Sequence, residues 1–176
     1  RMQTLIEDLL ELSQVTTKGE PFEKVDLGKI ALEVIEDLDA KLQTTQGKVT
    51  LGKLPRIEAD PFQMRQLLQN LIENALKYHK VDTPPQVLLD SSFTIKTGWT
   101  INVKDNGIGL NEKFAERIFI PLERLHGISA YEGTGIGLAI CKKIISRHGG
   151  SIFVKSQEGQ GSTFTFTLPE IQSPVR

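Results

Sequence analysis

One stretch of the sequence, residues 60–78 (DPFQMRQLLQNLIENALKY), constrains the fold more than any other. Asp60 is a favourable helix N-cap and Pro61 suits the first helical position, so a helix is predicted to begin here. Apolar side chains then recur at helical spacing and predict one buried face: Leu67, Leu68, Leu71, Ile72, Ala75 and Leu76. We therefore expect a long amphipathic helix at the centre of the fold.

The opposite face of this helix carries a polar group at offsets of three, four and seven residues: Asn70, Glu73, Asn74 and Lys77. Amide and carboxylate oxygens suit a hard cation, and a lysine suits a phosphate. Taken alone, such a pattern is more often a solvated helix surface. Its interpretation depends on the glycine-rich segments farther along the chain.

Composition limits the function classes. The 21 Lys and Arg nearly balance the 22 Asp and Glu, which argues against binding to nucleic acid by bulk charge. Cys141 is the only cysteine, so an internal disulfide is excluded and a reducing, cytoplasmic setting is favoured. No apolar run approaches the roughly 18 residues of a membrane span, although a longer parent protein could be soluble or membrane-anchored.

The chain divides into four parts. Residues 1–16 predict a short helix whose apolar seam fits either an ordinary packing helix or a dimer contact. The helical pattern is already under way at the first residue, as expected of a piece of a longer protein. Residues 17–24 predict a linker, 25–169 one domain, and 170–176 a tail.

Within the domain, strands and helices mix without regular βαβ alternation. Further helices are predicted over 27–45, near 112–118 and from about 137 to 148, and strands over 48–51, near 57, and over 86–90, 92–96, 99–104, 151–156 and 162–168. This order favours an α+β protein, a two-layer sandwich with a mostly antiparallel mixed sheet and helices on one face.

Two glycine-rich segments suggest ligand contacts. Asp105 ends a strand and is followed by Gly107 and Gly109, which places a carboxylate beside backbone that can approach a ligand closely, although a simple turn has the same letters. Such a carboxylate can accept from an exocyclic amine, as adenine offers. Residues 133–137 (GTGIG) precede an apolar helix whose first N–H groups favour anionic oxygens.

Four motifs occur in an order and at spacings that resemble those of sensor histidine kinases: NLIENALKY at 70–78, DNGIG at 105–109, Ile118-Phe119 with Pro121, and GTGIGLAI at 133–140. They are similar to that family's asparagine box, first glycine box, phenylalanine box and second glycine box. The resemblance spans about residues 22–169, and the segments LERLHG and YEGTGIGLAICKKI are most similar to the phytochrome-like branch.

The resemblance implies a Bergerat ATP-binding fold and the catalytic domain of a two-component kinase. Such a domain uses ATP and Mg²⁺, and the intact protein transfers the γ-phosphoryl group to a histidine on a dimerisation helix and thence to a response regulator. The resemblance implies that the intact protein is a homodimer and has no nucleic-acid partner. It also implies that residues 1–16 are the end of the dimerisation hairpin.

The resemblance also implies roles for single residues. Asn74 would hold the metal, and Asn70, Lys77 and Arg124 would act catalytically by supporting the metal–phosphate cluster. Residues 111–133 would form a lid over ATP. The implied cofactor-binding set is Asn70, Asn74, Lys77, Tyr78, Asp105, Gly107, Gly109, Arg124, Thr134, Gly135, Gly137, Leu138 and Ser162.

The chain departs from the family in its acceptor. His79, His126 and His148 are the only histidines, and none has the acidic neighbour and helical context of a phosphoacceptor. We therefore expect ATP binding without autophosphorylation. Leu122 stands where many relatives carry phenylalanine and is expected to remain an apolar anchor of the lid, whereas Arg147 is expected on a solvated helix face.

Two alternatives remain open. A degenerate kinase domain would hold nucleotide or a partner without transferring phosphate. A related ATPase of the gyrase, MutL or chaperone group would use water as the acceptor, but such enzymes usually carry a glutamate where this chain has Asn70.

Overall fold

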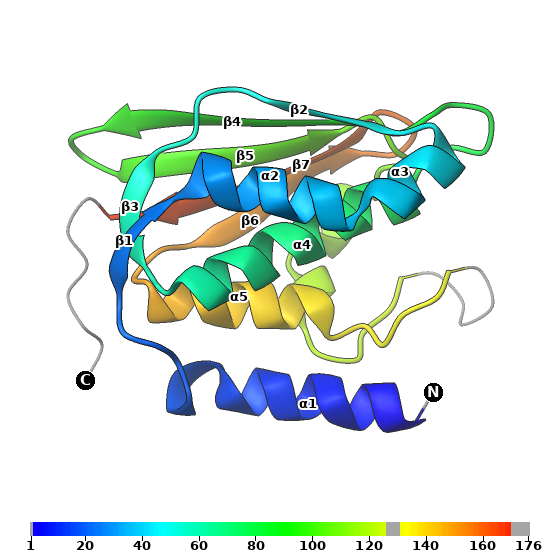
Figure 1. Cartoon of the computed structure of the whole chain (residues 1–176). Coiled ribbons are helices and arrows are strands. Elements are labelled where there is room, and N and C mark those ends of the chain that lie inside the picture. Colours follow the sequence, from blue (N-terminus) through cyan, green and yellow to red (C-terminus); the bar gives the residue numbers. More distant parts are fainter. Residues whose placement is uncertain (1, 126–130, 170–176) are drawn as a thin grey trace.

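A five-stranded sheet covered on one face by helices forms the body of the protein (Figure 1). The computed structural model describes residues 2–125 and 131–169. Helices α2 (Leu27–Asp37), α4 (Pro61–Lys77) and α5 (Gly137–Arg147) lie on the covered face, with α3 (Asp39–Thr45) at the end of α2. Helix α1 (Met2–Thr17) lies outside these layers, beside α5.

The sheet is mixed and mostly antiparallel. Its order is β2-β4-β5-β7-β6, formed by β2 (Lys48–Leu51), β4 (Gln86–Thr94), β5 (Gly98–Asp105), β7 (Gly161–Leu168) and β6 (Ile152–Gln157). Only the β2–β4 pair is parallel. A separate antiparallel pair joins β1 (Glu23–Asp26) to β3 (Arg56–Ala59). The predicted fold class is confirmed.

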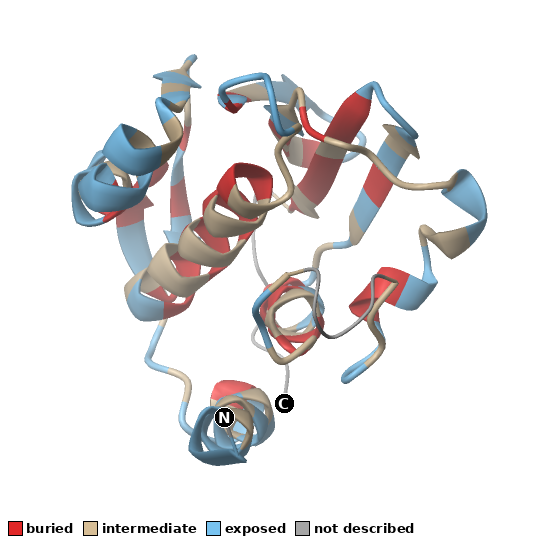
Figure 2. Ribbon diagram, turned by 90° about the vertical axis from the view of Figure 1, so that its right-hand side faces the viewer, coloured by how far each residue is buried: buried red, intermediate tan, exposed pale blue. Residues whose placement is uncertain are grey.

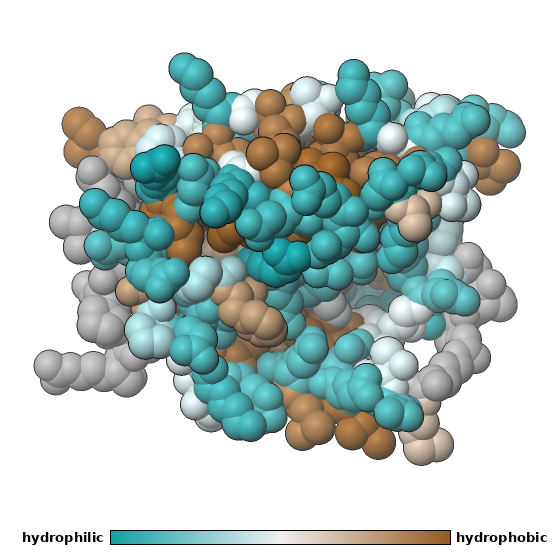
Figure 3. All heavy atoms as spheres, in the orientation of Figure 1, coloured by the Kyte–Doolittle hydropathy of each residue, from teal (hydrophilic) through white to brown (hydrophobic). Residues whose placement is uncertain are grey.

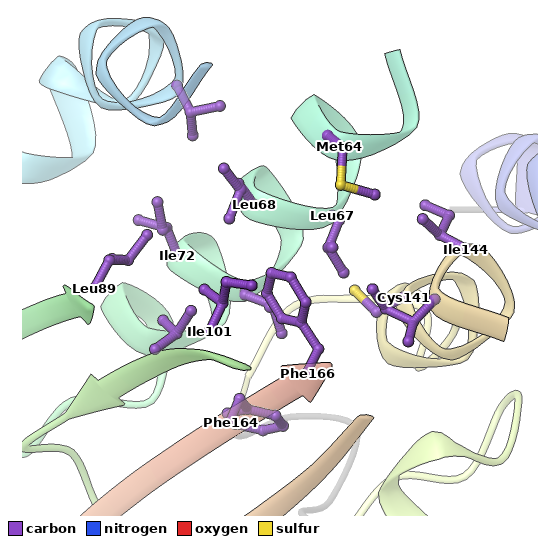
Figure 4. Close-up of a cluster of buried hydrophobic side chains, with 14 of the residues drawn as sticks. Met64, Leu67, Leu68, Ile72, Leu89, Ile101, Cys141, Ile144, Phe164 and Phe166 are labelled. Carbon is purple, nitrogen blue, oxygen red and sulfur yellow. The ribbon is translucent and has the colours of Figure 1, made fainter. Parts of the chain in front are cut away.

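Helix α4 supplies the centre of the core, as its sequence predicts. The Asp60 carboxylate accepts a hydrogen bond from the Gln63 N–H at 3.1 Å, and Pro61 occupies the first turn. All six apolar residues of the predicted stripe are buried. Of these, Leu67, Leu68 and Ile72 lie among side chains from the sheet and α5 (Figure 4). Cys141 belongs to this core, and burial raises the pKa of its thiol to about 12, so it acts as a small apolar side chain.

Three local predictions were wrong in detail. The helix expected over 27–45 breaks at Leu38. This residue is buried, and its N–H group donates to both the Val34 and the Ile35 carbonyls. The two strands expected over 86–96 form the single strand β4, because the polar residues in its middle find partners: Asn102 donates to Asp90, and Ser91 donates to the Lys53 carbonyl. The helix expected near 112–118 is two 3-10 turns, Glu112–Phe114 and Arg117–Phe119.

Helix α1 has one covered face and one open face. Val15 is buried and Leu5 and Leu12 are half-buried on the side toward the domain, whereas most of the helix is exposed (Figure 2). Hydrophobic atoms therefore reach the surface at the edge where α1 lies (Figure 3), from Met2, Ile6, Leu9 and Leu10. Among residues 2–125 and 131–169, no helix has the length and apolar character needed to cross a membrane.

The junction between α1 and the domain is held by a buried polar network. Asp60 is 1% exposed, and its carboxylate accepts from the Glu20 N–H at 2.7 Å and from the Arg147 guanidinium at 2.8 Å. The same guanidinium donates to the Gln63 side chain, and Gln63 donates to the Val15 carbonyl at 2.7 Å. The side chain of Arg147 is only 16% exposed, so the expectation that it lies on a solvated face was wrong.

His148 belongs to the same junction. Its Nε2 accepts from the Asp60 N–H at 3.1 Å, so Nδ1 carries the proton and donates to the Ile144 carbonyl at 2.7 Å. Its ring stacks on Phe22, with centroids 4.4 Å apart. Burial lowers the pKa of His148 below its usual range, and the Arg147 charge adds to this effect. The imidazole is therefore held neutral.

This environment predicts a pH dependence of stability. Below pH about 6.5 the unfolded chain binds a proton at His148 that the folded chain does not, so the free energy of unfolding should fall as pH falls from 7.5 to 5.5. One such proton contributes at most about 1.4 kcal/mol per pH unit. Denaturant unfolding at both pH values measures this slope. In His148→Gln the slope should be shallower, and an unchanged slope would contradict the assignment.

Candidate nucleotide-binding site

The main cavity opens between α4, the start of α5 and the ends of β5 and β7. Its volume is about 1030 Å³. All of the cofactor-binding residues expected from the sequence line it, except Gly107. The expected lid, residues 111–133, falls partly outside the described residues, as do His126 and the predicted tail 170–176. Leu122 is 53% exposed, so it is not the apolar anchor that was expected.

The carboxylate of Asp105 lies at the cavity wall. Its Oδ1 accepts from the Gly107 N–H at 2.8 Å and from the Ser162 N–H at 3.2 Å. No hydrogen bond to Oδ2 occurs within the described part of the chain, so this oxygen is available to a donor in the cavity. Burial raises the pKa of Asp105 above its usual range, although both backbone bonds oppose the effect. A fixed, partly desolvated acceptor of this kind suits an exocyclic amine.

Ser156, which the sequence analysis did not single out, organises the wall beside Asp105. Its hydroxyl donates to the Gly161 carbonyl at 2.9 Å and accepts from the Leu110 N–H at 2.8 Å. The Ser162 hydroxyl, 2.7 Å away, must therefore donate to Ser156. This leaves the lone pairs of Ser162 as acceptors at the cavity. The pairing depends on strands β6 and β7 meeting in register, which no local sequence signal reveals.

The backbone of the first glycine segment, residues 105–109, packs closely against the backbone of two other parts of the chain. A Cβ at Gly107 would lie 2.4 Å from the Tyr78 carbonyl oxygen, and the next residue, Ile108, donates to that carbonyl at 2.9 Å. Gly109 has φ +64°, and a Cβ there would lie 2.1 Å from the Gln157 carbonyl oxygen. These glycines thus hold the segment between the end of α4 and the β6–β7 hairpin, and so fix the position of Asp105.

Replacing Gly109 with alanine should be far more damaging than the same change at Gly159. Both residues have positive φ, but a Cβ at Gly159 would meet nothing within 4 Å. We expect Gly159→Ala to lower the free energy of unfolding by about 1 kcal/mol, the cost of the left-handed backbone, and Gly109→Ala by about 2–4 kcal/mol. Urea unfolding of the two variants measures the difference, and equal losses would contradict the packing argument.

Residues of α4 also line the cavity. Asn70, Asn74 and Lys77 all line it, in keeping with their shared helix face. The Asn70 amide lies 3.4 Å from the Gly137 carbonyl and so links α4 to the first turn of α5. Lys77 Nζ lies 4.8 Å from the centre of the Tyr78 ring. No carboxylate within the described residues forms an ion pair with Lys77, so its charge is available to an anion.

The second glycine segment faces these groups. Leu122 donates to the Gly135 carbonyl at 3.0 Å, which holds Arg124 beside Gly135 at the cavity wall. The Arg124 guanidinium donates to the Tyr131 carbonyl. Helix α5 begins at Gly137, and its N-cap residue, Ile136, supplies no side-chain hydrogen bond to the first turn. The N–H groups of that turn therefore remain suitable for anionic oxygens.

The donor set for a metal consists of amide oxygens. The described residues contain no group of three or more His, Cys, Asp or Glu side chains that could hold a metal ion. Mg²⁺ commonly binds through one or two protein oxygens together with substrate phosphates and water. Asn74 at the cavity wall fits that arrangement, with a nucleotide supplying the remaining ligands.

Several further cavity residues were not predicted. Helix α1 contributes Thr4 and Asp8, and α3 contributes Lys41 and Thr45. Lys41 pairs at 3.3 Å with Glu73, which also lines the cavity. These residues reach the cavity only through the tertiary packing of α1 and α3, so their local sequences give no sign of it.

The family model described as "Histidine kinase-, DNA gyrase B-, and HSP90-like ATPase" matches residues 59–172. The match covers more than half of the chain, so the chain belongs to this family. Cyanobacterial phytochrome A from Nostoc sp. (strain PCC 7120 / SAG 25.82 / UTEX 2576) is 42% identical over 168 residues, which are 96% of this chain and 22% of that protein. This relative confirms the predicted resemblance to the phytochrome-like branch.

Solved structures agree with this assignment. Full-length ShkA in complex with AMPPNP superimposes with a TM-score of 0.81 and 25% identity, covering 99% of this chain and 37% of that one. The histidine kinase ThkA in complex with the response regulator protein TrrA gives a TM-score of 0.72 and 25% identity, covering 97% of this chain and 48% of that one. The chain is therefore similar to one part of longer kinases.

Proposed function

We propose that the cavity binds ATP as the catalytic domain of a sensor histidine kinase. The observation that carries this proposal is that two chemically unlike groups of residues line one cavity. Asp105 offers an open carboxylate oxygen, and Lys77 and the uncapped start of α5 offer positive charge and N–H groups. Adenine needs the first and a triphosphate the second. The AMPPNP bound by ShkA, a relative of the same fold, supports the assignment.

We propose that Mg²⁺ accompanies the nucleotide. The side-chain oxygen of Asn74 would hold the ion, Asn70 would support it from the previous turn, and the phosphates would complete its coordination. Bound there, the ion would neutralise charge on the phosphates during transfer. Lys77 and Arg124 would add fixed positive charge on the same side, so that phosphoryl transfer relies on positioning and electrostatics.

The phosphoryl acceptor would lie outside this chain. We propose that the longer protein supplies a histidine on a dimerisation hairpin and passes the phosphoryl group to a response regulator, as the ThkA–TrrA complex suggests by its composition. The open apolar face of α1 would pack against the rest of that hairpin and against a second copy, giving a homodimer. Residues 25–169 would be the catalytic unit, with residues 17–24 as the connection and a cytoplasmic setting for both.

The experiment that tests this function adds the acceptor hairpin of the longer protein to the chain with Mg²⁺ and γ-labelled ATP. We expect label on the hairpin histidine and none on the chain alone. Nucleotide binding without transfer would favour a degenerate binding module instead. Appreciable release of phosphate by the chain alone would favour a water-using ATPase of the gyrase or chaperone group.

A further inference from the structure

Helix α1 contributes a carboxylate to the nucleotide cavity. The helix packs on α5, with Val15 buried and Leu5 and Leu12 half-buried. This packing brings Thr4 and Asp8 to the cavity wall, although they precede α4 by more than fifty residues in the sequence. Asp8 is thus the one acidic residue of α1 that lines the cavity, among those that the structure describes.

The Asp8 carboxylate accepts a hydrogen bond from the Thr134 hydroxyl. Thr134 belongs to the glycine segment at the start of α5, between Gly133 and Gly135. A Cβ at Gly133 would lie 2.7 Å from Lys77 Nζ, so the segment runs directly past the lysine that faces the cavity. The Asp8 carboxylate therefore lies against a segment that runs past Lys77 and leads into the first turn of α5.

We infer that Asp8 competes with the phosphates of a bound nucleotide for Thr134, so that docking of α1 and triphosphate binding oppose each other. The inference rests on the proposed ATP site. The Thr134 hydroxyl has one hydrogen, and while it is given to Asp8 it is not available to a phosphate oxygen. The carboxylate also repels the phosphate charge. Because such coupling is reciprocal, bound triphosphate loosens the contact between α1 and the glycine segment.

The structure predicts which ligands have an affinity that depends on Asp8. Adenosine has no phosphate and should bind independently of Asp8, whereas MgATP should bind more tightly once the carboxylate is gone. Asp8→Asn removes the charge and keeps an acceptor, and Asp8→Ala removes both. Glu7→Gln is the matched control, because Glu7 lies on the same helix, is exposed, accepts from Gln3 at 3.2 Å and does not line the cavity.

Calorimetric titration of the whole chain with MgATP and with adenosine tests the inference. We expect Asp8→Ala to tighten MgATP binding by about threefold to tenfold, Asp8→Asn by less, and Glu7→Gln not at all, with adenosine binding unchanged in every variant. Hydrogen exchange should also rise in α1 of the wild type when MgATP binds. Unchanged or weaker MgATP binding in Asp8→Ala would overturn the inference, as would an equal gain for adenosine. Failure of every variant to bind any nucleotide would instead overturn the ATP site itself.

Discussion

Replacing Asp105 with asparagine is expected to weaken ATP binding by about 1–3 kcal/mol, or roughly fivefold to 150-fold. Asparagine keeps an oxygen that can accept from the Gly107 and Ser162 N–H groups, so the local structure of the cavity wall should be unchanged. The open carboxylate oxygen becomes an NH₂ group, however, and this group cannot accept from the amine of adenine. The substitution should therefore lower the affinity for the adenine base without lowering the stability of the fold.

The same change should alter base selectivity. An NH₂ group at this position can donate to the O6 carbonyl of guanine, so the preference for ATP over GTP should narrow or reverse in Asp105→Asn. Asp90→Asn is the matched control, because Asp90 lies on the neighbouring strand β4, accepts from Asn102 at 2.9 Å and does not line the cavity. Competition titration with ATP and GTP measures both effects. An unchanged ATP preference in Asp105→Asn would remove Asp105 from base recognition.

Replacing Asp60 with alanine is expected to lower the free energy of unfolding by about 3–5 kcal/mol. The carboxylate caps α4, accepts from the Glu20 N–H and pairs with Arg147, all within a buried site. Alanine would leave the guanidinium without its anionic partner, and a buried unpaired charge is costly. The change should also release the segment that joins α1 to the domain.

Urea unfolding of Asp60→Ala beside Asp26→Ala measures this effect. Asp26 caps α2 through the Lys29 N–H at 3.1 Å, but it lies at the surface, where its pairing with Arg56 is screened by solvent. Its loss should therefore be much less damaging. Asp60→Asn, which keeps the cap and removes the charge, should fall between the two. If Asp60→Ala were no more harmful than Asp26→Ala, the buried network would not stabilise the junction.

The elements that local sequence patterns specify could be predicted from the sequence. The stripe of α4, its cap at Asp60 and the strand over 99–104 all depend on local sequence patterns, and the structure confirms them. The unbroken course of β4 depends instead on contacts with distant residues. For example, Ser91 is accommodated in β4 because its hydroxyl donates to the Lys53 carbonyl, thirty-eight positions away.

The site divides in the same way. The residues of the four motifs could be named from the sequence because their order and spacing resemble a known family. Asp8, Ser156 and Arg147 could not, because each acts through a partner that only tertiary packing supplies: Thr134, Ser162 and Asp60. The glycines illustrate the difference further. The sequence identified Gly107 as important, but the structure places the Tyr78 carbonyl, and not the cavity, where its side chain would be.

Calorimetric titration of the unmodified chain with a non-hydrolysable ATP analogue, with and without Mg²⁺, tests directly whether the cavity binds nucleotide. We expect binding to one site per chain, strengthened by Mg²⁺ because Asn74 and the phosphates would share the ion. The absence of binding in both conditions would contradict the assignment of the cavity between α4 and α5 as a nucleotide site.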